Sequence, residues 1–262
     1  MTGRRGGYFS TQTIMIRFFL TATAILSALF AGATAAPADT ITVMSYNIRN
    51  STGMDNVRDF DRTAAVISAA NPSVVAILEA DSITGRSKGT YVLGELAQRT
   101  GMQPFFAPAI DYDGGRYGIG LLTAETPLSV VRHALPGREE ARALIIAEFK
   151  DFIFAATHLS LTEEDALESA SIISGLFADA KKPVIIAGDF NVTPDSETIS
   201  LLSKQFTMVN NPETPTFPAD EPNTTIDYIM IKGEGMEAIE CEVVNAPTQS
   251  DHRPLVAKLL VK

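Results

Sequence analysis

The sequence predicts one large α/β domain, and three observations carry this prediction. Short apolar runs rich in β-branched residues alternate along the chain with amphipathic segments of helical period. Several of the apolar runs are unbroken, which is typical of strands covered on both faces. These runs end abruptly in polar residues, and ligands of open α/β sheets bind outside the carboxyl ends of the strands. The pattern therefore also predicts where a functional site would lie.

The first 36 residues have the layout of a secretory signal peptide. Three Arg residues precede an apolar run at residues 18–33, and small residues at 33–36 offer a cleavage point. A membrane anchor is the alternative, but two Thr residues interrupt the run and no basic residues follow it. We therefore expect residues 1–36 to be removed. Residues 37–262 would remain as a secreted or periplasmic domain with no stable membrane anchor.

The charge of the chain argues against a polyanionic partner. The 262 residues include 21 basic and 31 acidic side chains, for a formal charge of −10. Residues 1–36 contain three Arg and no acid, so the mature domain would keep 18 basic and 31 acidic residues, a formal charge of −13. Affinity for nucleic acid comes mainly from Lys and Arg, and the chain has no basic run and no Trp for base stacking. Long nucleic acid is therefore not the expected partner, although a locally positive groove stays open.

Cysteine usage adds little to the fold prediction. The single Cys241 cannot form an internal disulfide, so an exported domain would depend on packing alone. About 226 residues can bury a generous core in one domain. We expect a monomer.

The first half of the domain follows the order strand, helix, strand. Asp59 or Asp61 begins the first helix and Asn71-Pro72 stops it. The second strand runs directly into Glu79, a carboxylate that is costly to bury unless it is paired or bound to metal. The elements expected here are strands at 40–48, 74–78, 103–107, 118–123 and 128–134, helices at 60–70 and 91–100, and a turn-rich loop at 111–117.

The same order recurs in the second half. Strands at 142–149 and 152–158 are separated by Lys150-Asp151, which predicts a hairpin. Thr162 begins a helix with acidic residues in its first turn, as the helix dipole prefers, and its apolar face continues to Ala180. A central strand at 184–187, a loop at 216–225 and strands at 226–231, 237–244 and 255–261 complete the domain.

Polar residues at the strand ends are the candidate site. Asn47 and Glu79 end strands in the first half, and His158 and Asp189 end strands in the second. Asn191 follows Asp189 by two positions, so both can face one crevice while the residue between them turns into the core. The alternative is a simple turn, which Asp, Asn and Pro all favour.

The last third adds an acid and a histidine. Asp227 is expected inside an apolar strand, where a carboxylate needs a partner, and a histidine is the obvious one. Ser250, Asp251 and His252 are consecutive, so they cannot converge as a hydrolase triad.

Together these residues favour a Mg²⁺ or Mn²⁺ site. Mg²⁺ binds carboxylates, waters and phosphate oxygens, whereas zinc prefers Cys and His. A metal beside two imidazoles indicates phosphoester hydrolysis, in which the metal neutralises phosphate charge and a base activates water. The hard oxygen donors are Asn47, Glu79, Asp189, Asn191, Asp227 and Asp251, and His158 and His252 join them.

Six short motifs, in order along the chain, resemble the endonuclease/exonuclease/phosphatase superfamily, also called deoxyribonuclease-I-like. The resemblance implies a four-layer α/β sandwich, with two mixed sheets face to face, helices outside and a metal site at one end. The motifs are Ser45-Tyr46-Asn47, Ile77-Leu78-Glu79, Thr157-His158-Leu159, Gly188-Asp189-Phe190-Asn191, Ile226-Asp227-Tyr228 and Ser250-Asp251-His252.

The resemblance also implies roles for the metal-binding and catalytic residues. Glu79 resembles the principal Mg²⁺ ligand, with Asn47 and Asp251 beside it. Asp189 would position or deprotonate the attacking water. The family often has Gln before the metal-binding Glu, where this chain has Leu78.

Further roles follow from the same resemblance. Asn191 would orient the phosphate, and His252 would contact a phosphate oxygen or transfer a proton while Asp227 holds it. His158 resembles a second histidine of the nuclease and phosphatase branches, which disfavours abasic-site repair. The expected substrate-binding residues are Tyr117, Arg116 and Arg142.

The sequence thus predicts an exported, Mg²⁺-dependent phosphoesterase for a small or lipid-linked substrate. A secreted nuclease is the main alternative among enzymes, and a phospholipid or sphingolipid phosphodiesterase stays open. The alternative of another class is a binding module that kept the fold and lost the chemistry.

Overall fold

The computed structural model describes residues 1–3, 7 and 39–262. The predicted signal peptide lies almost entirely outside these residues and stays a prediction. Residues Ala36–Lys262 form one compact unit, and this unit holds every element described below. Within the described residues, no helix is both long and apolar enough to cross a membrane.

Residues 39–262 form two mixed six-stranded sheets. In each sheet one central pair of strands is parallel, β1 with β2 and β7 with β8, and the other pairs are antiparallel. The first sheet has the order β11 (Met236–Val243), β12 (Leu255–Val261), β1 (Asp39–Asn47), β2 (Val74–Ser82), β4 (Gly115–Thr123) and β3 (Gln103–Tyr112). The second has β5 (Ser129–Leu135), β6 (Arg142–Glu148), β7 (Ile153–His158), β8 (Val184–Asp189), β10 (Asp227–Lys232) and β9 (Thr207–Met208).

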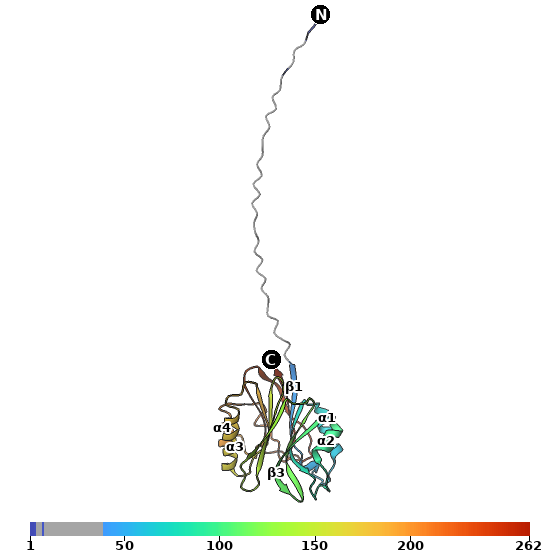
Figure 1. The fold of residues 1–262 in the computed structure, drawn as a ribbon, viewed down its shortest axis with the longest axis vertical. Helices are drawn as coiled ribbons and strands as arrows, with labels where there is room; N and C mark the ends of the chain where they lie inside the picture. The colour runs from blue at the N-terminus through green and yellow to red at the C-terminus, as the bar shows by residue number, and fades with distance from the viewer. Residues whose placement is uncertain (4–6, 8–38) are drawn as a thin grey trace. The chain divides into compact units, whose positions relative to one another are not determined.

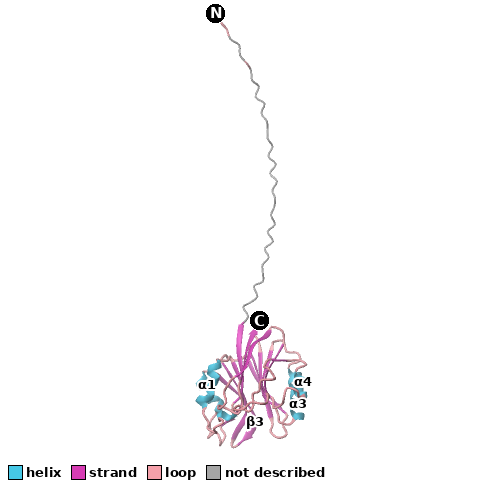
Figure 2. Ribbon diagram, turned by 180° about the vertical axis from the view of Figure 1, so that it is seen from behind, coloured by secondary structure: helices cyan, strands magenta, loops and turns pink. Residues whose placement is uncertain are grey.

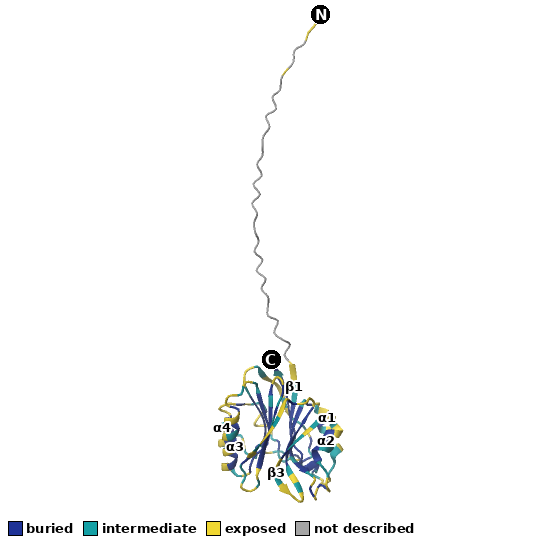
Figure 3. Cartoon of the chain, in the orientation of Figure 1, coloured by how far each residue is buried: buried dark blue, intermediate teal, exposed yellow. Residues whose placement is uncertain are grey.

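Helices cover the outer face of each sheet (Figures 1 and 2). Helices α1 (Phe60–Ala70) and α2 (Val92–Thr100) pack on the first sheet, and α3 (Glu163–Leu176) and α4 (Glu197–Leu202) pack on the second. Three buried apolar clusters separate the four layers, one between the sheets and one under each helix pair (Figure 3). The predicted four-layer α/β sandwich is confirmed.

Most of the predicted elements are present, and the differences have local causes. The predicted loop at 111–117 is wrong, because β3 and β4 continue through it and turn only at Asp113-Gly114. Both turn residues have positive φ, 46° and 78°, as a tight two-residue hairpin turn requires. The third helix ends at Leu176 rather than Ala180, just after Gly175, a poor helix former. The short elements α4, β9 and a 3₁₀ turn at Arg49–Ser51 were not predicted.

The parallel strand pairs bring the candidate residues to one end of the domain. In β8, Ile185 and Ala187 face the core between the sheets, so Asp189 continues the same face at the end of that core. Its register neighbours are His158 on β7 and Asp227 on β10. The sequence prediction had Asp227 inside its strand, but it is the first residue of β10, and the antiparallel register therefore sets it opposite Asp189.

Candidate functional site

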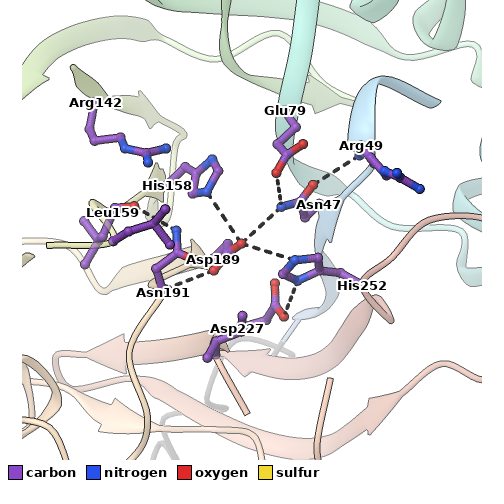
Figure 4. A network of polar contacts seen from close by, with 12 residues as sticks. Asn47, Arg49, Glu79, Arg142, His158, Leu159, Asp189, Asn191, Asp227 and His252 are labelled. Atoms are coloured by element: carbon purple, nitrogen blue, oxygen red, sulfur yellow. Dashed lines mark hydrogen bonds and ion pairs between the residues drawn. The ribbon is translucent and has the colours of Figure 1, made fainter. Parts of the chain in front are cut away.

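Asp189 is the centre of the candidate site, and its carboxylate is buried at the end of the core between the sheets. The Nε2 atoms of His158 and His252 both lie 3.6 Å from its Oδ2 atom, and Asn47 donates a hydrogen bond of 3.1 Å to the same oxygen. Figure 4 shows these side chains converging from both sheets. Side chains from three other strands or loops therefore meet at the Asp189 carboxylate.

Glu79 reaches the site because β2 contains a bulge. Leu78 faces the core between the sheets, so strict alternation would turn Glu79 to the opposite face. The register with β4 shifts between Ile77 and Ala80, and Glu79 has a φ of 58°, which is strained for a residue with a side chain. The bulge turns the carboxylate toward Asn47, which donates to Glu79 Oε1 over 3.0 Å.

Asn47 links the two carboxylates with a fixed amide. Its Nδ2 atom donates to both Glu79 and Asp189, and its Oδ1 atom accepts from the backbone amide of Arg49 over 3.1 Å. Oδ1 therefore accepts its hydrogen bond on the side away from the two carboxylates, and this contact fixes the orientation of the side chain.

His252 is held by Asp227. The Nδ1 atom of His252 is 2.9 Å from Asp227 Oδ2, and Thr216 donates a hydrogen bond of 2.6 Å to the same oxygen. Burial alone would lower the pKa of His252, but the carboxylates of Asp227 and Asp189 outweigh it and raise the pKa to about 10. His252 is therefore an imidazolium at neutral pH. Thr216 was not predicted as a site residue, because the loop at 216–225 contains no motif that indicates a functional role.

His158 has the opposite protonation state. Burial lowers its pKa to about 4, although Asp189 acts to raise it. Asp189 is thus flanked by one charged and one neutral imidazole. This difference gives the two histidines different chemical capacities, because only His158 has a free lone pair at neutral pH.

Asp251 lies at the edge of the site beside Arg49. The Arg49 Nε atom is 3.6 Å from Asp251 Oδ2, and the Asp251 side chain is 28% exposed. Ser250 donates to the backbone oxygen of Asn47 over 2.7 Å, which ties this loop to β1. Arg49 was not predicted, although it follows Asn47 by only two residues.

Asn191 supports the loop after β7. Its Nδ2 atom donates to the backbone oxygen of Leu159 over 2.9 Å, and its backbone amide donates to Asp189 Oδ1 over 3.0 Å. We expected the Asn191 side chain to orient a phosphate. In this structure its Nδ2 donor is instead bonded to the main chain beside the cluster.

Tyr117 and Arg142 line a small pocket with His158. The Arg142 guanidinium is buried and lies 3.3 Å from Glu139 Oε1 and 3.1 Å from Glu140 Oε1. Its charge is therefore largely compensated. The Nε atom of Arg142 is buried without a hydrogen-bond partner among the described residues.

Arg116 lies outside this cluster. Tyr117 shares a strand face with Ile119 and Leu121, which pack between the sheets, so the neighbouring Arg116 points to the other face. The Arg116 side chain is 61% exposed and its Nε atom lies 3.5 Å from Asp111. Of the three expected substrate-binding residues, only Tyr117 and Arg142 adjoin the site.

Two sets of side chains could hold a metal ion. Ligand atoms of Asp189, Asp227 and His252 lie within 4.8 Å of one another. In that set the Asp227–His252 contact already uses Nδ1 of the imidazole, and because the pKa of His252 is raised, a metal ion would have to displace a proton from the ring to bind it. The other set is Glu79 with Asn47 and Asp251.

The Glu79 set fits a divalent cation better. Burial raises the pKa of Glu79, and the nearby charges of Asp251 and Asp189 raise it further, against the hydrogen bond from Asn47. The carboxylates here thus repel one another, and a bound cation would relieve that repulsion. Carboxylate oxygens are also ligands that Mg²⁺ prefers, and Asn47 would offer its amide oxygen only after turning the amide, because Nδ2 faces the carboxylates in this structure.

Buried carboxylates beside a charged and a neutral imidazole define a hydrolytic site with groups for proton transfer. Residues 44–252 match the Endonuclease/Exonuclease/phosphatase family, and the chain belongs to that family. The family consists of hydrolases that act on phosphoester bonds and depend on divalent metal ions. No curated protein sequence matches the chain.

Solved structures share the fold at low sequence identity. An endonuclease/exonuclease/phosphatase from Beutenbergia cavernae DSM 12333 has 21% identity and a TM-score of 0.73, with 85% of this chain and 72% of that one covered. A mannosyl-6-phosphatase of Bacteroides thetaiotaomicron VPI-5482 has 18% identity and a TM-score of 0.68, over 84% and 99% of the chains. The human Nocturnin catalytic domain with bound sulfate has 19% identity and a TM-score of 0.64, over 86% and 98%.

Proposed function

We propose that this protein is an exported, Mg²⁺-dependent phosphoesterase that hydrolyses a small or lipid-linked phosphomonoester or phosphodiester by attack of water on phosphorus. The observation that carries the proposal is the convergence of Asn47, His158 and His252 on the buried carboxylate of Asp189. The packing of an apolar core does not require a buried acid, two imidazoles and an amide at its end, so a functional role explains this group better.

Glu79 would be the principal ligand of the ion, with Asn47 and Asp251 beside it. The ion would supply neutralisation of the phosphate charge and polarisation of its oxygens. Mn²⁺, with the same preference for oxygen ligands, is an alternative ion. The strained bulge at Glu79 supports this assignment, because backbone strain of this kind clusters at functional sites.

Asp189 is the proposed base for the attacking water. Burial and the charge of Asp227 raise the pKa of Asp189, against the influence of both histidines and Asn47. A carboxylate with a raised pKa is a better proton acceptor than an exposed one. Its Oδ1 atom accepts the Asn191 amide, so Oδ2 is the oxygen that faces the site.

His252 and His158 would act on the phosphate. His252, fixed through Nδ1 by Asp227, presents its Nε2–H toward Asp189 and can donate it to a phosphate or leaving oxygen. His158 is neutral and can accept or donate a hydrogen bond there. Asn191 would keep the adjoining loop in place, and Tyr117 and Arg142 would contact the substrate.

The arginines near the site support a small substrate. Arg142 is compensated by two glutamates, and Arg116 faces away toward Asp111. Arg253 donates to the backbone oxygen of Ala219 over 2.7 Å. An extended nucleic-acid backbone needs several free cationic contacts, whereas one phosphate needs one or two. The similar structure named as a mannosyl-6-phosphatase is compatible with a small phosphoester.

A nuclease is the second candidate function, and a substrate panel separates the two. The purified protein would be treated with chelator, then assayed with and without Mg²⁺ against p-nitrophenyl phosphate, bis(p-nitrophenyl) phosphate, sugar phosphates, lysophospholipid and sphingomyelin vesicles, and plasmid DNA. We expect Mg²⁺-dependent hydrolysis of at least one small or lipid-linked ester.

Two results of this panel would contradict the proposal. Cleavage of plasmid DNA with strong salt inhibition, while all small and lipid esters are untouched, would favour the nuclease. No hydrolysis of any phosphoester under any metal condition would favour a binding module on the same fold.

Export belongs to the same proposal and rests on the layout of residues 1–36, and the monomeric state stays an expectation. N-terminal sequencing of exported protein should find a start near Ala36 or Pro37. An intact sequence from Met1 onward in the exported protein would count against cleavage.

A further inference from the structure

An ion pair between the buried carboxylate of Asp81 and the partly exposed guanidinium of Arg86 lies next to the site. Asp81 follows Glu79 by two residues, and its side chain is fully buried. Arg86 donates to it from Nε and Nη2, each over 2.8 Å, in a bidentate pair that fixes the guanidinium plane. Thr84 and Asn50 each donate to the same carboxylate over 2.8 Å, so Asp81 also has a fixed position.

The fixed guanidinium lies against two aromatic rings of the β3–β4 hairpin. Its central carbon is 4.5 Å from the ring centroid of Tyr112 and 5.2 Å from that of Tyr117. The two rings are 6.3 Å apart. Cation–π attraction at these distances favours one arrangement of the rings on the guanidinium. The backbone amide of Arg86 also donates to Asp113 in the hairpin turn.

Of these two rings, Tyr117 alone adjoins the site. It lines the small pocket with Arg142 and His158, whereas Tyr112 is 40% exposed. Burial raises the pKa of Tyr117 well above its usual value, and the charge of Glu79 adds to this effect.

We propose that Arg86 is a positioning residue, and this inference rests on the proposed function. Asp81 holds the Arg86 guanidinium in place, and the guanidinium in turn holds the Tyr117 ring. The Tyr117 hydroxyl is thereby oriented toward the substrate. Among the described residues, Arg86 makes no hydrogen bond or ion pair with the carboxylate cluster, and it meets the small pocket only through the ring of Tyr117. Its role follows from geometry alone: a bidentate anchor on one side of the guanidinium and the ring of a site residue on the other.

The test compares Arg86→Met and Arg86→Lys with a matched control. Arg99 is also paired with two carboxylates, Asp61 and Glu95, and lies over an aromatic ring, Phe60, at 5.5 Å, but it joins only the outer helices. Arg99→Met therefore removes an equivalent interaction far from the cluster. If Arg86→Met alone does not fold because it leaves the buried Asp81 charge unpaired, the variant carrying both Asp81→Asn and Arg86→Met removes both charges of the pair together.

The first readout is the spectrum of Tyr117, which needs no substrate. The protein would be labelled with fluorotyrosine, and the Tyr117 resonance assigned by its loss in Tyr117→Phe. We expect Arg86→Met and Arg86→Lys to shift or broaden this ¹⁹F resonance, and Arg99→Met to leave it unchanged. An unchanged Tyr117 resonance in every folded Arg86 variant would overturn the proposal, whether or not the protein is an active phosphoesterase.

The second readout is kinetic, with bis(p-nitrophenyl) phosphate or p-nitrophenyl phosphate, whichever the unmodified protein hydrolyses. We expect Arg86→Met to lower kcat by roughly tenfold with KM changed less than about twofold, since misplacing a substrate-contacting group costs rate. Lys should not rescue it, because it lacks the bidentate fork. In a Tyr117→Phe background the same change should have little further effect. Equal losses in both backgrounds would show that Arg86 does not act through Tyr117.

Discussion

His252→Ala and Asp227→Asn are each expected to lower kcat by roughly 10³-fold, and the double variant by about the same factor, because residues that act as one unit lose activity non-additively. The Nδ1 atom of His252 lies 2.9 Å from Asp227 Oδ2, and this contact both orients the ring and keeps it protonated. Loss of either partner therefore damages the same proton donor.

The measurement is kcat and KM for the two single variants and the double variant, with melting temperatures to confirm folding. His133→Ala is the matched control, since His133 lies on β5 in a surface groove and makes no contact with the cluster among the described residues. Its kcat should stay within about twofold of the unmodified protein, as for surface changes in general. Strictly additive losses in the double variant would reject the pairing.

Glu79→Gln is expected to lower the metal-dependent rate by on the order of 10²- to 10³-fold, which is typical of removing one electrostatic contributor to a transition state. Stability should be unchanged or slightly increased. Burial raises the pKa of Glu79, and the charges of Asp251 and Asp189 raise it further, so its charge is unfavourable in the folded protein without metal, and Gln removes that charge. The Gln oxygen can still accept the hydrogen bond from Asn47.

Rates at saturating Mg²⁺ and melting temperatures in chelator would check both parts of this prediction. Glu125→Gln, at an exposed acid outside the cluster, is the control and should change neither quantity. A Glu79→Gln variant with a near-normal rate and normal Mg²⁺ dependence would show that Glu79 is not the metal ligand. A variant that is inactive because it is unfolded would show that Glu79 has a structural role instead.

The sequence predicted the fold and the members of the cluster because both depend on local patterns. Unbroken apolar strands that end in Asn47, His158 and Asp189 are visible in the residues themselves, and parallel pairing then brings these strand ends together. The family resemblance supplied the face-to-face packing of the two sheets, which periodicity alone could not predict.

Other features depend on geometry that the sequence does not show. The bulge that turns Glu79 into the site is a single extra residue in the register of β2. Thr216 reaches Asp227 from a loop without regular structure. Arg116 was placed at the site because the register of β4 was unknown, and the observed alternation turns it away. The stacking of Arg86 on Tyr117 needs the hairpin that was predicted as a loop.

The central claim is that a divalent ion binds at Glu79, leaving Asp189, Asp227 and His252 for proton transfer. Calorimetric titration of Mg²⁺ and Mn²⁺ into the metal-free protein, Glu79→Gln and Asp227→Asn tests it most directly, because it needs no substrate. Our account predicts that Glu79→Gln weakens binding by at least about tenfold, while Asp227→Asn changes it by less than about threefold, as expected when only one of the two is a ligand. Binding that survives Glu79→Gln and is lost in Asp227→Asn would contradict the account and place the ion among Asp189, Asp227 and His252.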